Sequence, residues 1–122
     1  MSRFVIRQVN TGFKFDLYAP NGQSVLTSEV YATAAACRKG IASVVKNAPG
    51  AKLEDQTAEP VRAQTNPKFE LYRDRAGNHR FRLKARNGEI IAISEPYSGK
   101  SSCLMGIESV RKNAAEAEIM EE

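Results

Sequence analysis

The sequence predicts an α+β protein of two tandem βββαβ repeats, related by a pseudo-twofold axis and joined in one sheet with two helices on one face. The first observation is self-similarity, because Asn21-Gly22 recurs as Asn87-Gly88, an offset of 66, and many pairs follow at that offset. The second is that each half holds short alternating segments followed by a segment of helical spacing. The third is size, since one unit of about 50 residues has a small core and exposed sheet edges that two joined units can cover.

The two halves align over most of their length. Matched pairs at the offset of 66 include Phe15 with Phe81, Leu17 with Leu83, Tyr31 with Tyr97, and Cys37 with Cys103. We therefore expect a first repeat over residues 2–55, a linker over 56–66 and a second repeat over 67–121, with both repeats in one compact domain. The linker is polar, holds two Pro and shows no periodicity.

Three strands are expected at the start of each repeat. Apolar and polar side chains alternate over 3–8 and 13–18, and again over 68–73 and 79–84, and the third strands are expected over 24–28 and 89–94. Strict alternation is typical of antiparallel strands with one solvated face. Asn21-Gly22 and Asn87-Gly88 predict type I′ turns before the third strands.

A helix and a short fourth strand complete each repeat. Apolar residues spaced by four, three and four positions predict one buried helical face, formed by Cys37, Ile41, Val44 and Ala48 in the first repeat and by Cys103, Ile107, Val110 and Ala114 in the second. We expect Thr33 and Ser98 as N-caps and Asn47 and Asn113 near the helix ends. The fourth strands are expected over 52–55 and 118–121.

Each helix carries an unexpected glycine in its middle, Gly40 and Gly106. Glycine there costs about 1 kcal/mol relative to Ala. Its presence at both equivalent positions predicts a close approach of the helix backbone to the sheet.

Composition narrows the classes of function. The chain has 122 residues, 42% hydrophobic and 26% charged, which is typical of a soluble globular protein. It shows no apolar run of membrane-spanning length, no signal peptide and only two Cys, so we expect a cytoplasmic protein without membrane contact. A single His leaves too few side chains for most metal sites and His-based catalytic groups, and no cofactor is expected.

Several segments resemble one known family. They are Phe69-Glu70-Leu71-Tyr72-Arg73-Asp74, Phe81-Arg82-Leu83-Lys84-Ala85, Asn87-Gly88-Glu89-Ile90-Ile91 and the helical residues 106–114. Together they resemble the YegP-like family of small bacterial proteins with one or two such repeats. The resemblance implies one shared antiparallel sheet in which the C-terminal strands are exchanged between repeats. It implies no catalytic or binding residues, because the family is uncharacterised.

The second repeat carries a basic stripe, defined as Arg80, Arg82 and Lys84 on the polar face of one strand. Tyr72 shares that face on the neighbouring strand, and Arg73 lies near the turn. The net charge is +4, and cations beside an aromatic ring can hold phosphate and stack a base, so these five residues are the candidate ligand or nucleic-acid binding residues. Alternatively the cations only solubilise the open face, partly neutralised by nearby carboxylates.

The two cysteines occupy equivalent apolar positions. Cys37 and Cys103 can be buried as reduced thiols, or they can form a disulfide if their Cα atoms approach within about 7 Å. Neither has a sequence neighbour that supports a metal site or redox catalysis.

The Ser-Glu-Xaa-Tyr segments before each helix allow two interpretations. Glu29 and Glu95 can act as general bases if they are buried, or they can support the helix N-termini while Tyr31 and Tyr97 pack between sheet and helix. His79 has no apparent partner, and we expect it to be packed or solvated.

We therefore expect a non-enzymatic binding or structural module with a ligand or protein-partner surface on the open face around the basic stripe. Nucleic-acid or polyanion binding through the same stripe is the alternative, and an enzyme is the third hypothesis. We expect a monomer, because two repeats in one chain replace a dimer.

Overall fold

The computed structural model describes residues 1–122 as two repeats with the same order of elements. The first contains β1 (Arg3–Val9), β2 (Gly12–Tyr18), β3 (Ser24–Ser28), α1 (Ala34–Asn47) and β4 (Lys52–Asp55). The second contains β5 (Lys68–Arg73), β6 (His79–Lys84), β7 (Ile90–Ile93), α2 (Lys100–Asn113) and β8 (Glu118–Glu121). One turn of 3-10 helix follows each α-helix. Every predicted strand and helix is present, and neither helix is long and apolar enough to cross a membrane.

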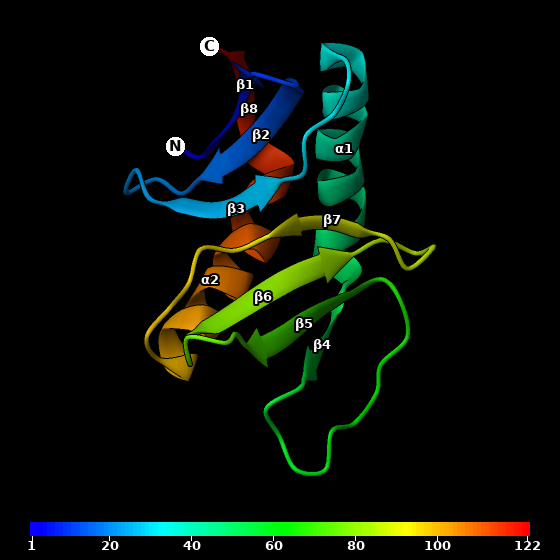
Figure 1. The fold of residues 1–122 in the computed structure, drawn as a ribbon, viewed down its shortest axis with the longest axis vertical. Coiled ribbons are helices and arrows are strands. Elements are labelled where there is room, and N and C mark those ends of the chain that lie inside the picture. Colours follow the sequence, from blue (N-terminus) through cyan, green and yellow to red (C-terminus); the bar gives the residue numbers. More distant parts are fainter.

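All strands form one sheet in the order β4-β5-β6-β7-β3-β2-β1-β8. The repeats meet at its centre, where Thr27 and Ser28 of β3 pair with Ile93 and Ala92 of β7. Figure 1 shows both helices on the same side of this sheet. The predicted α+β architecture, with a shared sheet and helices on one face, is confirmed.

The last strand of each repeat joins the sheet beside the first strand of the other repeat. β4 pairs with β5, and β8 pairs with β1, so the exchange of C-terminal strands is confirmed. Both of these pairings are parallel, whereas all other neighbouring strands are antiparallel. The sheet is therefore mixed rather than wholly antiparallel. Parallel neighbours need a long connection, which the linker supplies between β4 and β5 and the whole intervening chain supplies between β1 and β8.

One continuous core lies between the sheet and the helices. Its four phenylalanines are fully buried, with Phe4 edge-to-face on Phe15 in the first repeat and Phe69 edge-to-face on Phe81 in the second. All eight helix positions predicted from the 4, 3, 4 spacing are buried, with at most 1% exposure. Because residues of both repeats belong to the same cluster, neither repeat has a separate core.

The Asn-Gly turns differ from the prediction. Gly22 and Gly88 have positive φ, but Asn21 and Asn87 do not, so these are not type I′ turns. The Gly22 N–H donates to the Ala19 carbonyl, and Ala19 donates to Gln23, which is the pattern of a tight turn closed by a left-handed glycine. Such a loop places a bulge in the hairpin, and the pairing of β2 with β3 shifts register between Leu17 and Tyr18.

The two helix N-termini also differ. Thr33 caps α1 as predicted, since its hydroxyl accepts the N–H of Ala36. The prediction of Ser98 as the cap of α2 is wrong, because Gly99 occupies that position and no side chain caps the helix. Gly99 is the counterpart of Thr33 in the second repeat, so Ser98 stands one position too early.

The mid-helix glycines lie against tyrosines, as the predicted close approach requires. A Cβ on Gly40 would overlap the hydroxyl of Tyr31, and a Cβ on Gly106 would overlap that of Tyr97. Tyr31 in turn stacks on Phe15, with ring centroids 6.4 Å apart. Each tyrosine therefore fills the space between the sheet and the helix that the missing side chain leaves.

Replacing Gly40 by Ala should destabilise the protein although Ala favours helix. The gain in helix propensity is about 1 kcal/mol, whereas overpacking against Tyr31 costs about 1–3 kcal/mol, so we expect a net loss of up to about 2 kcal/mol. Gly50→Ala is the control, because no atom lies within 4 Å of its added Cβ. Urea unfolding measures both variants, and a Gly40→Ala protein as stable as the parent would contradict this packing.

Candidate functional site

The structure places four of the five candidate binding residues, the three of the basic stripe and Tyr72, on the open face of the sheet. Phe81 and Leu83 of β6 are buried in the core, so the intervening Arg82 and its neighbours Arg80 and Lys84 face away from the helices. Tyr72 lies opposite Arg80 on β5. The fifth candidate, Arg73, is exposed at the strand end, where it donates to the Gly77 carbonyl at 3.3 Å.

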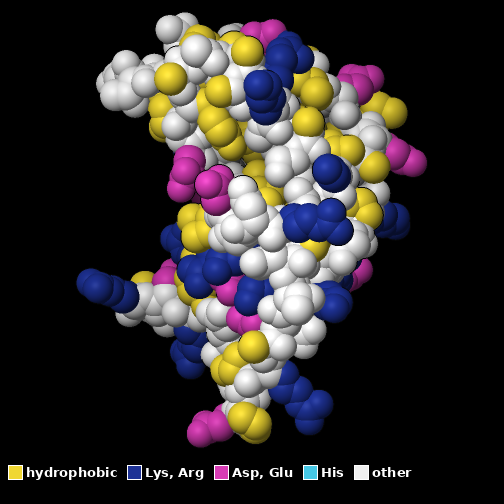
Figure 2. Space-filling model, turned by 90° about the vertical axis from the view of Figure 1, so that its right-hand side faces the viewer, with side chains coloured by type: hydrophobic (Ala, Val, Ile, Leu, Met, Phe, Trp, Pro, Cys, Tyr) yellow, Lys and Arg dark blue, Asp and Glu magenta, His cyan; other side chains and the backbone are white.

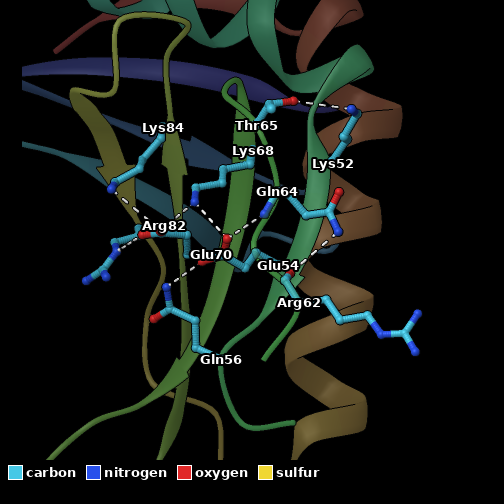
Figure 3. Close-up of polar contacts among 10 residues, drawn as sticks. All are labelled: Lys52, Glu54, Gln56, Arg62, Gln64, Thr65, Lys68, Glu70, Arg82 and Lys84. Carbon is cyan, nitrogen blue, oxygen red and sulfur yellow. Dashed lines mark hydrogen bonds and ion pairs between the residues drawn. The ribbon is translucent and has the colours of Figure 1, made fainter. Parts of the chain in front are cut away.

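Carboxylates neutralise this stripe. Glu70, only 3% exposed, accepts a hydrogen bond from Arg82 Nε at 2.6 Å and forms ion pairs with Lys68 at 3.2 Å and Lys84 at 3.5 Å. Arg80 pairs with Asp74 at 2.9 Å. Figure 3 shows Lys68, Arg82 and Lys84 turned toward Glu70. The stripe is therefore an ionic network rather than a row of free cations.

A second buried carboxylate extends the network to the linker. Glu54 is 4% exposed and accepts hydrogen bonds at 2.8 Å from Lys68 Nζ, Gln56 Nε2 and the backbone N–H of Gln64. These donors, led by Lys68, lower the pKa of Glu54 to about 2. Burial acts to raise the pKa of Glu70, but the hydrogen bonds from Arg82 and Lys68 outweigh it and lower that pKa.

The network leaves no continuous basic groove on the open face. Tyr72 is also engaged, because the Arg82 guanidinium lies 4.5 Å from its ring centroid and covers it. A nucleic acid would need free cations and a free aromatic face at this place. The structure therefore gives the nucleic-acid alternative no support at the basic stripe.

The other candidates have structural positions. Glu29 and Glu95 are both exposed, and neither side chain bonds to a helix N-terminus. Neither residue lines the hollow beside α1 or three other hollows of the protein. The general-base hypothesis therefore lacks its buried carboxylate. The preceding serines hold the segment instead: Ser28 accepts the N–H of Phe15, and Ser94 accepts that of Phe81, both at 2.9 Å.

The cysteines form no disulfide, and the histidine side chain has no hydrogen-bond partner at Nδ1. Cys37 and Cys103 are free and fully buried, and burial raises the pKa of Cys103 to about 11, which keeps the thiol protonated. His79 pairs through its backbone with Tyr97, and its Nδ1 has no partner.

A hollow of the surface lies elsewhere, between α1 and the turn that joins β6 to β7. This α1 hollow has a volume of about 570 Å³, and its polar lining consists of Lys39, Ser43, Lys46, Asn47, Arg86 and Asn87. None of its three cations forms an ion pair, and no carboxylate lines it. Figure 2, viewed from the α1 side, shows Lys and Arg side chains along this face. Its concave shape and its uncompensated charge suit an anion.

The α1 hollow has an equivalent with different chemistry. The α2 hollow, of about 470 Å³, lies between α2 and the turn that joins β2 to β3. Lys39 is replaced there by Met105, and Arg86 by Pro20, each at the equivalent position of the other repeat. The sequence did not reveal either hollow, because each combines the helix of one repeat with a turn of the other.

A family model described as a domain of unknown function, DUF1508, matches residues 9–55 and 74–121, once in each repeat. The chain belongs to the DUF1508 family. The UPF0339 protein plu2779 of Photorhabdus laumondii is 36% identical over 113 residues, which cover 93% of this chain and 86% of that protein. The solution NMR structure of yegP from E. coli, a protein of unknown function, has a TM-score of 0.79 at 31% identity and covers 99% of this chain and 92% of its own. The resemblance to YegP-like proteins is confirmed.

Some DUF1508 relatives contain a single repeat. A UPF0339 protein of Treponema denticola is 59% identical over 54 residues, which make up 44% of this chain but 93% of that protein. These relatives carry names of unknown function, so the DUF1508 family supplies the fold and no activity.

Proposed function

We propose that this DUF1508 protein is a non-enzymatic binding module that holds a small organic anion, with phosphate or carboxylate groups, in the α1 hollow. The observation that carries the proposal is that Lys39, Lys46 and Arg86 line one concave surface without a carboxylate. By contrast, the cations of the basic stripe are all paired. The three unpaired charges attract an anion together, because all of them line the same hollow. Ala42, Pro67 and Ala85 form an apolar part of the wall that can contact the organic part of the ligand.

The proposed site requires both repeats. Lys39 and Lys46 belong to α1 of the first repeat, whereas Arg86 and Asn87 belong to a turn of the second. Asn87 Oδ1 accepts the N–H of Glu89, which leaves its amide nitrogen as a donor. We propose that one monomeric chain forms the whole site, because its two repeats take the place of a dimer.

Charge reversal at Lys46 should weaken anion binding. Pyrophosphate and citrate are the probes, one for each anionic group, and NMR titration should place their shifts at α1 and residues 85–88. Removing one of three converging charges and adding a negative one should weaken binding about tenfold for Lys46→Glu, and added salt should weaken it further.

Lys112→Glu is the matched control, because Lys112 is the counterpart of Lys46 in the second repeat, is also exposed, and lies outside both hollows. It changes the net charge equally and should alter binding less than about twofold. Equal losses in the two variants, or no shifts around the α1 hollow with either probe, would reject the proposed site.

A further inference from the structure

The two ends of the sheet have the same backbone arrangement but different side chains. At one end, neighbouring strands place Glu54, Glu70 and Arg82 in a row across β4, β5 and β6. At the other end, the equivalent row across β8, β1 and β2 is Met120, Val5 and Asp16. Two buried carboxylates are thus replaced by a thioether and an aliphatic side chain.

The β4 end is covered by the chain's own linker. The N–H of Gln64 donates to Glu54 at 2.8 Å, and Lys52 Nζ donates to Thr65 at 3.2 Å. Because Gln64 lies by Glu54 and Thr65 by Lys52, the linker runs antiparallel to β4. Figure 3 shows this extended segment beside the strand.

The β8 end has no such cover. β8 is the last strand of the sheet and pairs only with β1, so its outer edge is free. A hollow of about 230 Å³, the β8 hollow, lies on the open face, and Val5, Tyr18 and Met120 form its apolar lining. Met120 is 49% exposed. No segment of residues 1–122 takes here the place that the linker takes at the β4 end, although the strands are arranged in the same way.

The surroundings of the β8 hollow are acidic. Glu118 and Glu122 form no ion pair, and Glu121 is bound to Arg38. The one cation in the lining is Arg3, whose guanidinium lies 5.0 Å from the Tyr18 ring centroid. Glu118 lies opposite Arg3 on β1, and the charge of Glu122 acts on Arg7, which is bound to Asp16, so the two carboxylates are partly compensated. Neither forms an ion pair, and beside an apolar surface they favour a basic occupant.

We propose that the β8 hollow binds an extended basic segment of a partner protein, which lies along β8 as the linker lies along β4. An apolar side chain of the segment contacts Val5, Tyr18 and Met120, and its cations face Glu118 and Glu122. The linker contacts β4 through the side chains of Glu54 and Lys52, and the free edge of β8 in addition offers backbone groups for strand addition. A second copy fits less well, because two adjoining β8 strands would bring glutamates of like charge together.

A short peptide in which Lys and Val alternate is the probe, and the same peptide with Glu in place of Lys tests the charge. The Lys peptide should shift the Met120 methyl and the β8 amide resonances, with binding detectable below about 1 mM. Met120→Lys should weaken this binding about tenfold, because it removes apolar contact and adds repulsion. Met105→Lys is the matched control, since Met105 is 72% exposed on α2, and it should change binding less than about twofold.

The proposal is overturned if neither peptide binds below about 1 mM, if the Glu peptide binds equally well, or if the two lysine variants weaken binding equally. Sedimentation equilibrium of the free protein tests the other occupant. Dimers that Met120→Lys dissociates and Met105→Lys does not would assign the β8 hollow to a second copy and reject the partner segment. Because this site lies outside the α1 hollow, its failure leaves the proposed anion site untouched.

Discussion

Cut apart within the linker, the two repeats should not persist as folded monomers. In fragment 1–55, β4 lacks β5, β1 lacks β8, and β3 lacks β7, and fragment 67–122 has the corresponding losses. The single core is also divided, so each fragment exposes apolar side chains that the other repeat now covers. An isolated unit of about 55 residues buries little surface, and we expect each fragment to unfold or to form a homodimer.

Circular dichroism and sedimentation velocity at micromolar concentration measure this outcome. An equimolar mixture should regain the helical signal and sediment as one heterodimer, because each fragment supplies the strand that the other lacks. A chain cut only after folding is the control for the cut itself, since its two pieces stay paired. Two fragments that each unfold cooperatively as monomers would contradict the shared core.

Patterns local in sequence predicted the fold well. The 4, 3, 4 spacing around Ile41 and Ile107 identified the buried helical faces, because burial on a helix depends on nearby residues. Recurrence at an offset of 66 identified the two repeats. Because a single repeat would leave its sheet edges exposed, the recurrence also predicted that the repeats join in one sheet. The two wrong predictions, the type I′ turns and the Ser98 cap, concern local backbone conformation, which the hydrophobic pattern does not determine. Asn21 keeps negative φ because the glycine after it supplies the left-handed residue, and Ser98 misses the cap by one position.

The candidate site was harder to predict, because whether its cations are free or paired depends on contacts between residues far apart in the sequence. The alternation of Arg80, Arg82 and Lys84 correctly placed them on one face. Glu54, which completes the network around them, belongs to the exchanged strand of the other repeat and reaches Lys68 only after that exchange. Likewise, Lys39 and Arg86 meet at one hollow although they are far apart in the chain. No spacing of residues in the sequence predicts that these side chains line the same hollow.

Glu70→Gln should lower the free energy of unfolding by about 2–4 kcal/mol at pH 7. The substitution keeps the size of the side chain but removes the charge that Arg82, Lys68 and Lys84 share. Removing one partner of a buried ionic group is costly because the remaining charges stay desolvated, although partial exposure of these cations reduces the effect. Glu108→Gln is the control: Glu108 pairs with Arg111, but its side chain is 68% exposed, so we expect less than about 0.5 kcal/mol.

The same network should make stability depend on acid pH, and this separates loss of charge from loss of packing. The pKa of Glu54 falls from 4.5 to about 2, and that of Glu70 is also lowered. A carboxyl group whose pKa is lower in the folded state stabilises the protein above its unfolded pKa, and this stability is lost as pH falls through the folded value. The gap between the parent and Glu70→Gln should therefore be widest above about pH 5 and narrow toward pH 2. Urea unfolding across this range measures the gap; a constant difference would mean that the carboxylate acts through its shape and hydrogen bonds rather than through its charge.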